Sequence, residues 1–288
     1  MTLEVQPFLH ASTSSWSYVL IDGGTRHSAV VDPVLDFDAK SGRMSTESAD
    51  AIVAFIRGRS LANQWILETH AHADHLSAAM HLKAAVGGQV AIGEGIREVQ
   101  RTFSGILNLG AEFVADGRQF DRLLADGEEL EIGSLCARAI ATPGHTSDSL
   151  SYQVADAVFV GDAIFMPDSG TGRCDFPGGD ARVLYASILR LHELPPSTRV
   201  FVGHDYGPGG RAACCETTIA AERAHNIHLR DGVTEQEFVE MRMRRDAGLE
   251  APALLYPAVQ FNIRGGRVPP AESNDRHYLK LPLSGTLT

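Results

Sequence analysis

Short apolar runs and alternating apolar and polar positions dominate the first two thirds of the chain. Both patterns are typical of β-strands, because successive side chains of a strand point to opposite faces of a sheet. The step Asp22-Gly23-Gly24 predicts a hairpin turn between two of these segments. The pattern predicts strands at residues 3–9, 16–21, 28–34, 64–67, 129–132, 136–141, 149–154, 157–160 and 199–202.

Apolar residues that recur every three or four positions predict helices between and after the strands. Ser45 or Thr46 can cap the first helix, which ends near Gly58. Antiparallel strands come first and strand–helix alternation follows, which favours a layered α/β fold over a purely parallel sheet. Further helices are expected at residues 76–86, 96–103, 180–192, 211–225 and 234–247.

The composition is that of a soluble globular protein with a sizeable core, because 44% of the 288 residues are apolar and 21% are charged. No uncharged apolar stretch approaches the ~18 residues of a membrane span, and the first residues lack the features of a secretory signal. The four cysteines form no CxxC pair, which favours free thiols in a reducing compartment. We therefore expect a cytoplasmic protein.

The net charge of −11 comes from 25 Lys and Arg against 36 Asp and Glu. This balance opposes binding to nucleic acids or to anionic membrane surfaces, which both require a basic protein surface. The chain also contains 12 histidines, and several of them lie within short windows. The clustered histidines therefore make metal binding a candidate function.

The densest group of metal-binding side chains is Thr69-His70-Ala71-His72-Ala73-Asp74-His75, which follows an apolar strand and precedes a helix. At the end of a strand, His70 and His72 point the same way because the side-chain period is two. The turn into the helix then brings Asp74 and His75 toward the same place. The segment predicts a metal site rather than a solvated histidine-rich loop.

Three further strand ends carry metal-binding side chains next to glycine. His145 follows a Pro-Gly step after one predicted strand, and Asp162 and His204 each follow a glycine after another. A lone histidine at any of these points would more often be structural. Four such strand ends favour one shared metal centre, built on loops that a rigid scaffold holds.

The order HxHxDH at 70–75, then His145, Asp162 and His204, resembles the metallo-β-lactamase superfamily. The resemblance implies an αβ/βα four-layer sandwich, in which two packed mixed sheets carry helices outside and the metal site lies at one edge. It implies a single domain over residues 1–288, with residues 211–288 as a helical and tail extension that completes the substrate site. The full ligand set would permit two metal ions, so membership alone does not define the reaction.

Two further segments are similar to the persulfide dioxygenases of this superfamily. Gly172-Arg173-Cys174-Asp175-Phe176 resembles their GRxDF element. Asn226-Ile227-His228-Leu229 resembles their NPxL segment, with Ile227 in place of the proline. Together with the tail from Gln260, the resemblance covers nearly the whole chain.

In the persulfide dioxygenases, one Fe(II) per chain is held by the residues at the positions of His70, His145 and Asp162. This 2-His-1-carboxylate set leaves three coordination positions open. The remaining metal-capable side chains would orient ligands and solvent in the active site; these are His72, Asp74, His75 and His204.

The implied reaction converts glutathione persulfide, dioxygen and water into glutathione and sulfite. The resemblance implies that Arg173 is a positive group near the developing sulfur–oxygen anion or the glutathione carboxylates; an ion pair with Asp175 is the equal alternative. Tyr206 matches a tyrosine that contacts glutathione in this family, and its alternative role is to cap the site. A homodimer is compatible with the resemblance.

Several other reactive or charged residues are expected to be structural. We interpret Cys174 as a packing residue rather than a nucleophile, because no base lies nearby in the sequence. Arg242, Arg244 and Arg245 are expected to be surface charges near a helix end. The adjacent pair Cys214-Cys215 is expected to pack within a helix.

Two alternatives to a dioxygenase remain open at this point. Glyoxalase II is a dinuclear thioester hydrolase on the same scaffold, and it shares the seven ligand positions and Tyr206. A non-catalytic persulfide or metal sensor is the other, although a sensor has no need of open coordination positions. The metal content of the purified protein would separate the dioxygenase from glyoxalase II.

Overall fold

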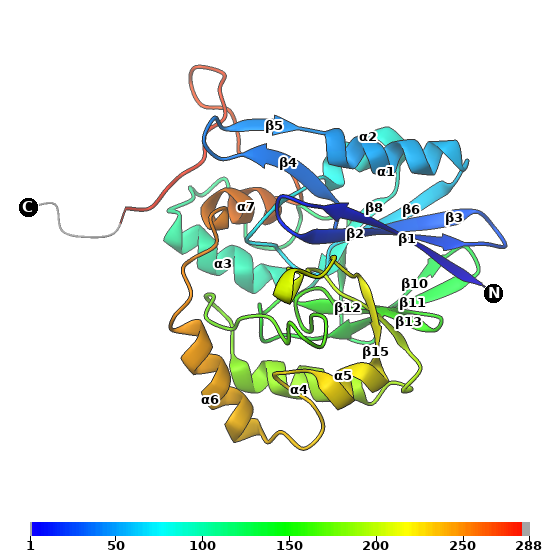
Figure 1. Cartoon of the computed structure of the whole chain (residues 1–288). Coiled ribbons are helices and arrows are strands. Elements are labelled where there is room, and N and C mark those ends of the chain that lie inside the picture. Colours follow the sequence, from blue (N-terminus) through cyan, green and yellow to red (C-terminus); the bar gives the residue numbers. More distant parts are fainter. Residues whose placement is uncertain (1, 284–288) are drawn as a thin grey trace, which may run out of the picture.

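Two six-stranded sheets form the centre of the computed structural model, which describes residues 2–283 (Figure 1). In the first sheet the first three strands pair antiparallel, and the pairs from the third strand to the last are parallel. In spatial order, its strands are β1 (Leu3–His10), β2 (Ser15–Asp22), β3 (His27–Val31), β6 (Ala62–Leu67), β8 (Gln89–Gly93) and β9 (Arg122–Leu124).

The second sheet is antiparallel except for one parallel pair, β13 with β14, which a helix connects. In spatial order, its strands are β10 (Glu129–Ile132), β11 (Leu135–Ala141), β12 (Leu150–Val154), β13 (Ala157–Phe159), β14 (Arg199–Phe201) and β15 (Glu216–Thr218). A separate small sheet has the order β5 (Arg43–Ser45), β4 (Val34–Asp38) and β7 (Leu76–Ser77).

Helices cover the outer faces of both large sheets (Figure 1). The helices beside the first sheet are α1 (Glu47–Gly58), α2 (Ala79–Val86), α3 (Ile96–Ile106) and α7 (Leu255–Asn262). The helices beside the second sheet are α4 (Ala181–His192), α5 (Ile219–His225) and α6 (Glu235–Asp246). A short 3-10 helix, η1 (Pro208–Gly210), lies between β14 and β15.

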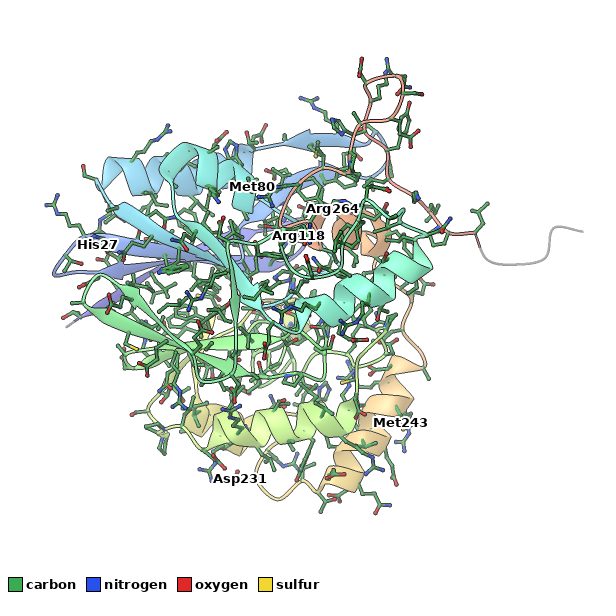
Figure 2. All side chains as sticks on the ribbon, turned by 180° about the vertical axis from the view of Figure 1, so that it is seen from behind. His27, Met80, Arg118, Asp231, Met243 and Arg264 are labelled. Atoms are coloured by element: carbon green, nitrogen blue, oxygen red, sulfur yellow. The ribbon has the colours of Figure 1, made fainter. Side chains whose placement is uncertain are left out.

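Three apolar layers hold these elements together, and their side chains fill the space between the ribbons (Figure 2). The inner layer lies between the two sheets and includes Tyr152 and Phe159. The outer layers lie between each sheet and its helices, and they include Ile52 on one side and Leu184 and Phe238 on the other. Helix, sheet, sheet and helix therefore succeed one another, which confirms the predicted four-layer α/β sandwich.

The predicted helix at residues 211–225 is wrong over its first half. Helix α5 begins only at Ile219, after strand β15 pairs with β14. Arg211 already has an extended backbone, with φ −67° and ψ 157°, and Thr218 caps α5 by accepting the Ala221 N–H at 3.1 Å. The prediction that Cys214-Cys215 packs within a helix is therefore also wrong: Cys214 is exposed in a loop.

Two other expectations need correction. Residues 76–86 are not one helix, because β7 precedes α2 and pairs with β4. Arg242 is not a surface charge, since only 2% of the residue is exposed and it pairs with Asp246 one turn later on α6. Helix α7 was not anticipated, because Pro257 within its first turn and the glycines that follow it resemble a loop sequence.

Candidate metal centre

The histidine and aspartate side chains singled out in the sequence converge where four strands end. The 70–75 loop follows β6, and His145, Asp162 and His204 follow β11, β13 and β14. These four strands belong to both large sheets, so the cluster lies at an edge shared by the two. The sheets hold the loops in place, and all of these residues are buried except Asp74, which is half-buried.

One group of potential ligands comprises His70, His145 and Asp162, whose ligand atoms all lie within 4.8 Å of one another. His145 Nε2 lies 3.6 Å from Asp162 Oδ2, and the rings of His70 and His145 meet edge to face with centroids 5.0 Å apart. Two imidazoles and one carboxylate thus face a common point.

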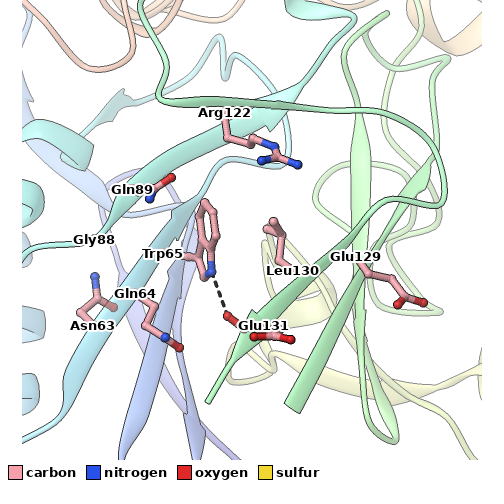
Figure 3. A pocket seen from close by; sticks show the side chains of 9 residues that line it. All are labelled: Asn63, Gln64, Trp65, Gly88, Gln89, Arg122, Glu129, Leu130 and Glu131. Carbon is pink, nitrogen blue, oxygen red and sulfur yellow. Dashed lines mark hydrogen bonds between the residues drawn. The ribbon is translucent and has the colours of Figure 1, made fainter. Parts of the chain in front are cut away.

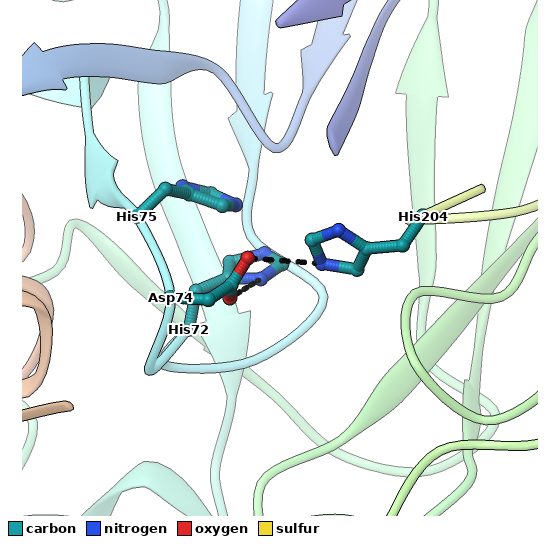
Figure 4. Close-up of side chains that lie close together, drawn as sticks. All are labelled: His72, Asp74, His75 and His204. Atoms are coloured by element: carbon teal, nitrogen blue, oxygen red, sulfur yellow. Dashed lines mark ion pairs between the residues drawn. The ribbon is translucent and has the colours of Figure 1, made fainter. Parts of the chain in front are cut away.

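A second group comprises His72, Asp74, His75 and His204 and satisfies the same 4.8 Å limit (Figure 4). Asp74 lies between two of the histidines, with Oδ2 3.3 Å from His204 Nε2 and Oδ1 3.9 Å from His72 Nδ1. Asp162 Oδ1 lies 3.4 Å from His204 Nε2, so this carboxylate faces both groups.

A threonine hydroxyl determines which nitrogen of His70 is free. Thr69 Oγ1 donates its hydrogen to Asp32 Oδ2 at 2.8 Å. The same oxygen lies 3.0 Å from His70 Nδ1, and it can only accept there because its hydrogen is already used. His70 therefore carries its proton on Nδ1, and Nε2 presents a lone pair to the site.

A backbone carbonyl determines which nitrogen of His145 carries the proton. Its Nδ1–H donates to the carbonyl oxygen of Arg173 at 2.7 Å, which leaves Nε2 as the unprotonated nitrogen toward Asp162. A partner that holds the far nitrogen of a histidine is the usual arrangement around metal-binding imidazoles.

The donor atoms of this cluster fit a metal ion. Among the described residues, His70 Nε2, Asp74 Oδ2, Asp162 Oδ1 and His204 Nε2 are buried without a hydrogen-bond partner. Buried polar atoms without partners are costly, and several that face one point indicate a ligand. Burial and the neighbouring histidines lower the pKa of His70 well below its usual value, which favours the neutral form that binds metals.

His72 has a different environment from His70. Its Nε2 lies 3.2 Å from Asp32 Oδ1. Burial alone would lower the pKa of His72, but Asp32 with the nearby aspartates outweighs it and raises this pKa to about 10. His72 also forms a third potential metal-binding group with Asp32 and Glu68.

Three residues that the sequence reasoning missed hold the 70–75 loop. Asp32 Oδ1 accepts the Thr69 N–H at 2.7 Å, and Asp148 Oδ2 accepts the Ala71 N–H at 2.8 Å. Asn262 of α7 donates through Nδ2 to two carbonyls of the loop, those of residues 72 and 75, at 2.8 Å each. Asp32 could have been found, because it directly follows an apolar strand and the other ligand loops also come shortly after strands.

Position 161, next to Asp162, has no room for a side chain larger than that of glycine. A Cβ on Gly161 would lie 2.5 Å from Thr69 Oγ1, and its φ of +50° disfavours other residues. The glycine therefore lets the Asp162 loop approach the hydroxyl that orients His70.

Arg173 and Tyr206 differ in their contacts: the Arg173 side chain is held by hydrogen bonds, whereas Tyr206 is exposed beside His204. Arg173 makes the predicted alternative contact, since Nε and Nη2 each donate to the Asp175 carboxylate at 2.6 Å and Nη1 donates to the Glu250 carbonyl at 2.8 Å. Tyr206 is 63% exposed, and its ring stacks on that of His204 with centroids 5.9 Å apart. Cys174 is buried, as expected of a packing residue, and burial raises its thiol pKa to about 12.

A cavity of about 620 Å³ lies elsewhere, at the opposite ends of the strands (Figure 3). Its lining includes Asn63 and Gln89 at the starts of β6 and β8, whereas the ligand loops follow the strand ends. Trp65 lines it and donates through Nε1 to the Glu131 carbonyl at 2.9 Å. In the part of the chain that the structure describes, no helix is long and apolar enough to cross a membrane.

Comparison with known proteins identifies relatives of the whole chain. The sequence model of the metallo-beta-lactamase superfamily matches residues 13–204. A probable metallo-hydrolase of Burkholderia pseudomallei is 50% identical over 98% of this chain and 99% of its own length. Glyoxylase B2 of Dictyostelium discoideum is 48% identical over 98% of this chain and 97% of its own.

More distant relatives carry more specific names. A hydroxyacylglutathione hydrolase of Methylococcus capsulatus is 32% identical over 86% of this chain and 81% of its own. The mitochondrial persulfide dioxygenase ETHE1 of Bos taurus is 26% identical over 89% of this chain and 87% of its own. The crystal structure of ETHE1 from Myxococcus xanthus is similar with a TM-score of 0.72 and 30% identity, over 93% of this chain and 100% of that chain.

Proposed function

This chain belongs to the metallo-β-lactamase superfamily, and we propose that within it the protein is a persulfide dioxygenase. Its substrates would be glutathione persulfide, dioxygen and water, and its products glutathione, sulfite and two protons. The similarity to an ETHE1 structure over 93% of this chain supports the proposal, as do the GRxDF-like segment and Tyr206. Residues 211–288 would complete the substrate site, since Asn262 in this part already contacts the ligand loop.

The observation that carries the proposal is that one group of ligands consists of two histidines and one carboxylate. His70, His145 and Asp162 form a group of three that does not include His72. Two histidines and one carboxylate are the ligands of non-haem Fe(II) oxygenases. Bound there, Fe(II) would supply open coordination positions for the persulfide sulfur and for dioxygen.

The residues of the chain would prepare this site in three ways. Thr69 and the Arg173 carbonyl hold protons on the far nitrogens of His70 and His145, so both imidazoles are ready to bind a cation. His72, Asp74, His75 and His204 would orient ligands and solvent on the other side of Asp162. Tyr206, exposed beside His204, would contact the glutathione part of the substrate.

A thioester hydrolase of the glyoxalase II type is the second candidate, and one observation favours it. The Asp162 carboxylate faces His145 with Oδ2 and His204 with Oδ1, which is where a carboxylate that bridges two metal ions would lie. The hydroxyacylglutathione hydrolase relative agrees with this reading. In a dinuclear enzyme, both groups of ligands would be occupied.

Metal analysis together with turnover tests the proposal. Protein purified without air should hold one iron per chain, consume oxygen with glutathione persulfide and leave S-lactoylglutathione intact. His70→Ala should lose both iron and oxygen consumption. Two metals per chain with thioester hydrolysis and no oxygen uptake would establish the hydrolase, and binding of a persulfide without turnover of either substrate would establish a sensor.

A further inference from the structure

Helix α6 carries a buried ion pair that contacts residues 171–174, the segment that also contacts His145. Arg242 and Asp246 are one turn apart, and neither is more than 6% exposed. We propose that these two residues are positioning residues for His145, and that they act through the backbone of residues 171–174. The inference rests on the proposed role of His145 as a metal ligand.

The pair binds both ends of the 171–174 segment. Arg242 contacts the Asp246 carboxylate through Nη2 and donates through Nη1 to the Thr171 carbonyl at 3.1 Å. Asp246 uses its other oxygen, Oδ2, to accept the Cys174 N–H at 2.9 Å. Because Arg242 and Asp246 also hold each other, the distance between the two anchor points on the segment is fixed.

The opposite face of the segment lies directly on two proposed ligands. The Arg173 carbonyl, located between the anchor points, accepts the His145 Nδ1–H at 2.7 Å. A Cβ on Gly172 would lie 2.1 Å from the Asp162 carbonyl oxygen and 3.2 Å from His145 Nδ1. The segment is therefore confined between the ligands and α6, and a shift of its anchors moves the carbonyl that orients His145.

Stability alone does not account for this ion pair. Burying two charges is costly, and replacement of such a pair by apolar side chains is often neutral or stabilising. What the pair contributes is its hydrogen bonds to two backbone groups, the Thr171 carbonyl and the Cys174 N–H. Apolar side chains could not form these bonds. A group that orients a ligand through its hydrogen bond changes metal affinity by about 10- to 100-fold when it is lost.

Asp246→Asn tests the inference, because it keeps the shape of the side chain and removes the charge that Arg242 contacts. We expect its affinity for Co(II), measured by chelator competition, to fall by about 10-fold. The visible absorption bands of the bound Co(II) should also shift, since they report ligand geometry. Phe238→Leu is the matched control, because Phe238 is buried on the same helix and packs on Tyr185 in the apolar cluster.

The control separates positioning from general loss of stability. At a comparable fall in melting temperature, Phe238→Leu should keep the wild-type spectrum and affinity; if it changes both as Asp246→Asn does, the inference is wrong. The double variant Arg242→Met/Asp246→Leu removes the pair without leaving a buried charge, so it keeps the test open if the single variant does not fold. A wild-type spectrum and affinity in the folded variant would overturn the inference.

A variant of the proposed ligand itself distinguishes a failure of the proposed metal site from a failure of this inference. His145→Ala should lose the Co(II) spectrum, whatever the substrate of the enzyme is. If His145→Ala binds Co(II) with an unchanged spectrum, the ligand assignment itself is wrong. The Co(II) measurements are made without persulfide, so their results do not depend on which reaction the enzyme catalyses.

Discussion

Thr69→Val removes the hydroxyl that connects Asp32 to the proposed ligand His70 while it keeps the shape of the side chain. In the protein, Thr69 Oγ1 donates to Asp32 Oδ2 at 2.8 Å and accepts from His70 Nδ1 at 3.0 Å. The backbone N–H of Thr69 still donates to Asp32 Oδ1 at 2.7 Å, so the loop keeps one anchor in the variant. The change therefore acts mainly on the side chain of His70.

The magnitude follows from the two lost hydrogen bonds. The bond to the Asp32 carboxylate contributes about 1.5–3 kcal/mol and the bond to His70 about 0.5–1.5 kcal/mol, so the free energy of unfolding should fall by about 2–4.5 kcal/mol. Without its acceptor, His70 loses the bond that keeps its proton on Nδ1. Loss of such an orienting bond lowers metal affinity by about 10- to 100-fold, which is about 1.4–2.7 kcal/mol of binding free energy.

Chelator competition under anaerobic conditions measures the affinity for Fe(II), and thermal unfolding of the metal-free protein measures the stability. Thr69→Ser is the matched control, because it keeps the hydroxyl and should stay within about 3-fold of the wild-type affinity. Wild-type affinity in Thr69→Val would refute the argument that this hydroxyl selects the tautomer of His70.

Three further changes test the loop contacts of Asn262, the role of Tyr206 and the titration of Glu222. Asn262→Ala removes the donor to two carbonyls of the ligand loop, so calorimetry should show about 2 kcal/mol less stability and chelator competition a weaker metal affinity; unchanged values would argue against this clamp. Tyr206→Ala removes an exposed ring from the mouth of the site, and steady-state kinetics should show a KM for glutathione persulfide raised severalfold with kcat within about 2-fold; a large loss of kcat with unchanged KM would contradict a role in binding. Burial raises the pKa of the Glu222 carboxyl to about 8, above the 4.5 of an unfolded chain, so wild-type stability should fall as pH rises from about 4.5 to about 8. Glu222→Gln cannot ionise, so its melting temperature should exceed that of the wild type by a margin that grows between pH 5 and pH 8, and a constant margin would show that Glu222 does not titrate there.

The parts of this structure that follow from the sequence are those that depend on short segments. Apolar runs predicted nine of the strands, although the sequence analysis missed β4, β5, β7, β8, β9 and β15. Metal-binding residues shortly after such runs predicted where His70, His145, Asp162 and His204 would meet. The ends of neighbouring strands in packed sheets share an edge, so local patterns are enough to place these side chains together. The four-layer arrangement came from the resemblance to a family, and the structure confirms it.

The parts that could not be predicted depend on contacts between distant segments. Asn262 binds the 70–75 loop across more than 180 positions of the chain, and no local pattern around it indicates a partner. Arg242 lies in a helix with polar residues on most sides, so its burial becomes visible only once Thr171 and Asp246 are placed beside it. Strand β15 was taken for helix because its three residues gain their pairing from β14.

The ratio of oxygen consumed to sulfite formed distinguishes a persulfide dioxygenase from a hydrolase in a single experiment. Anaerobically loaded Fe(II) protein would be mixed with glutathione persulfide in an oxygen-electrode chamber, and sulfite would be quantified in the same sample. We expect one dioxygen to be consumed for each sulfite and each glutathione released, and no turnover in His70→Ala. Thioester hydrolysis by a protein with two metal ions per chain, with no oxygen consumed on glutathione persulfide, would contradict this expectation.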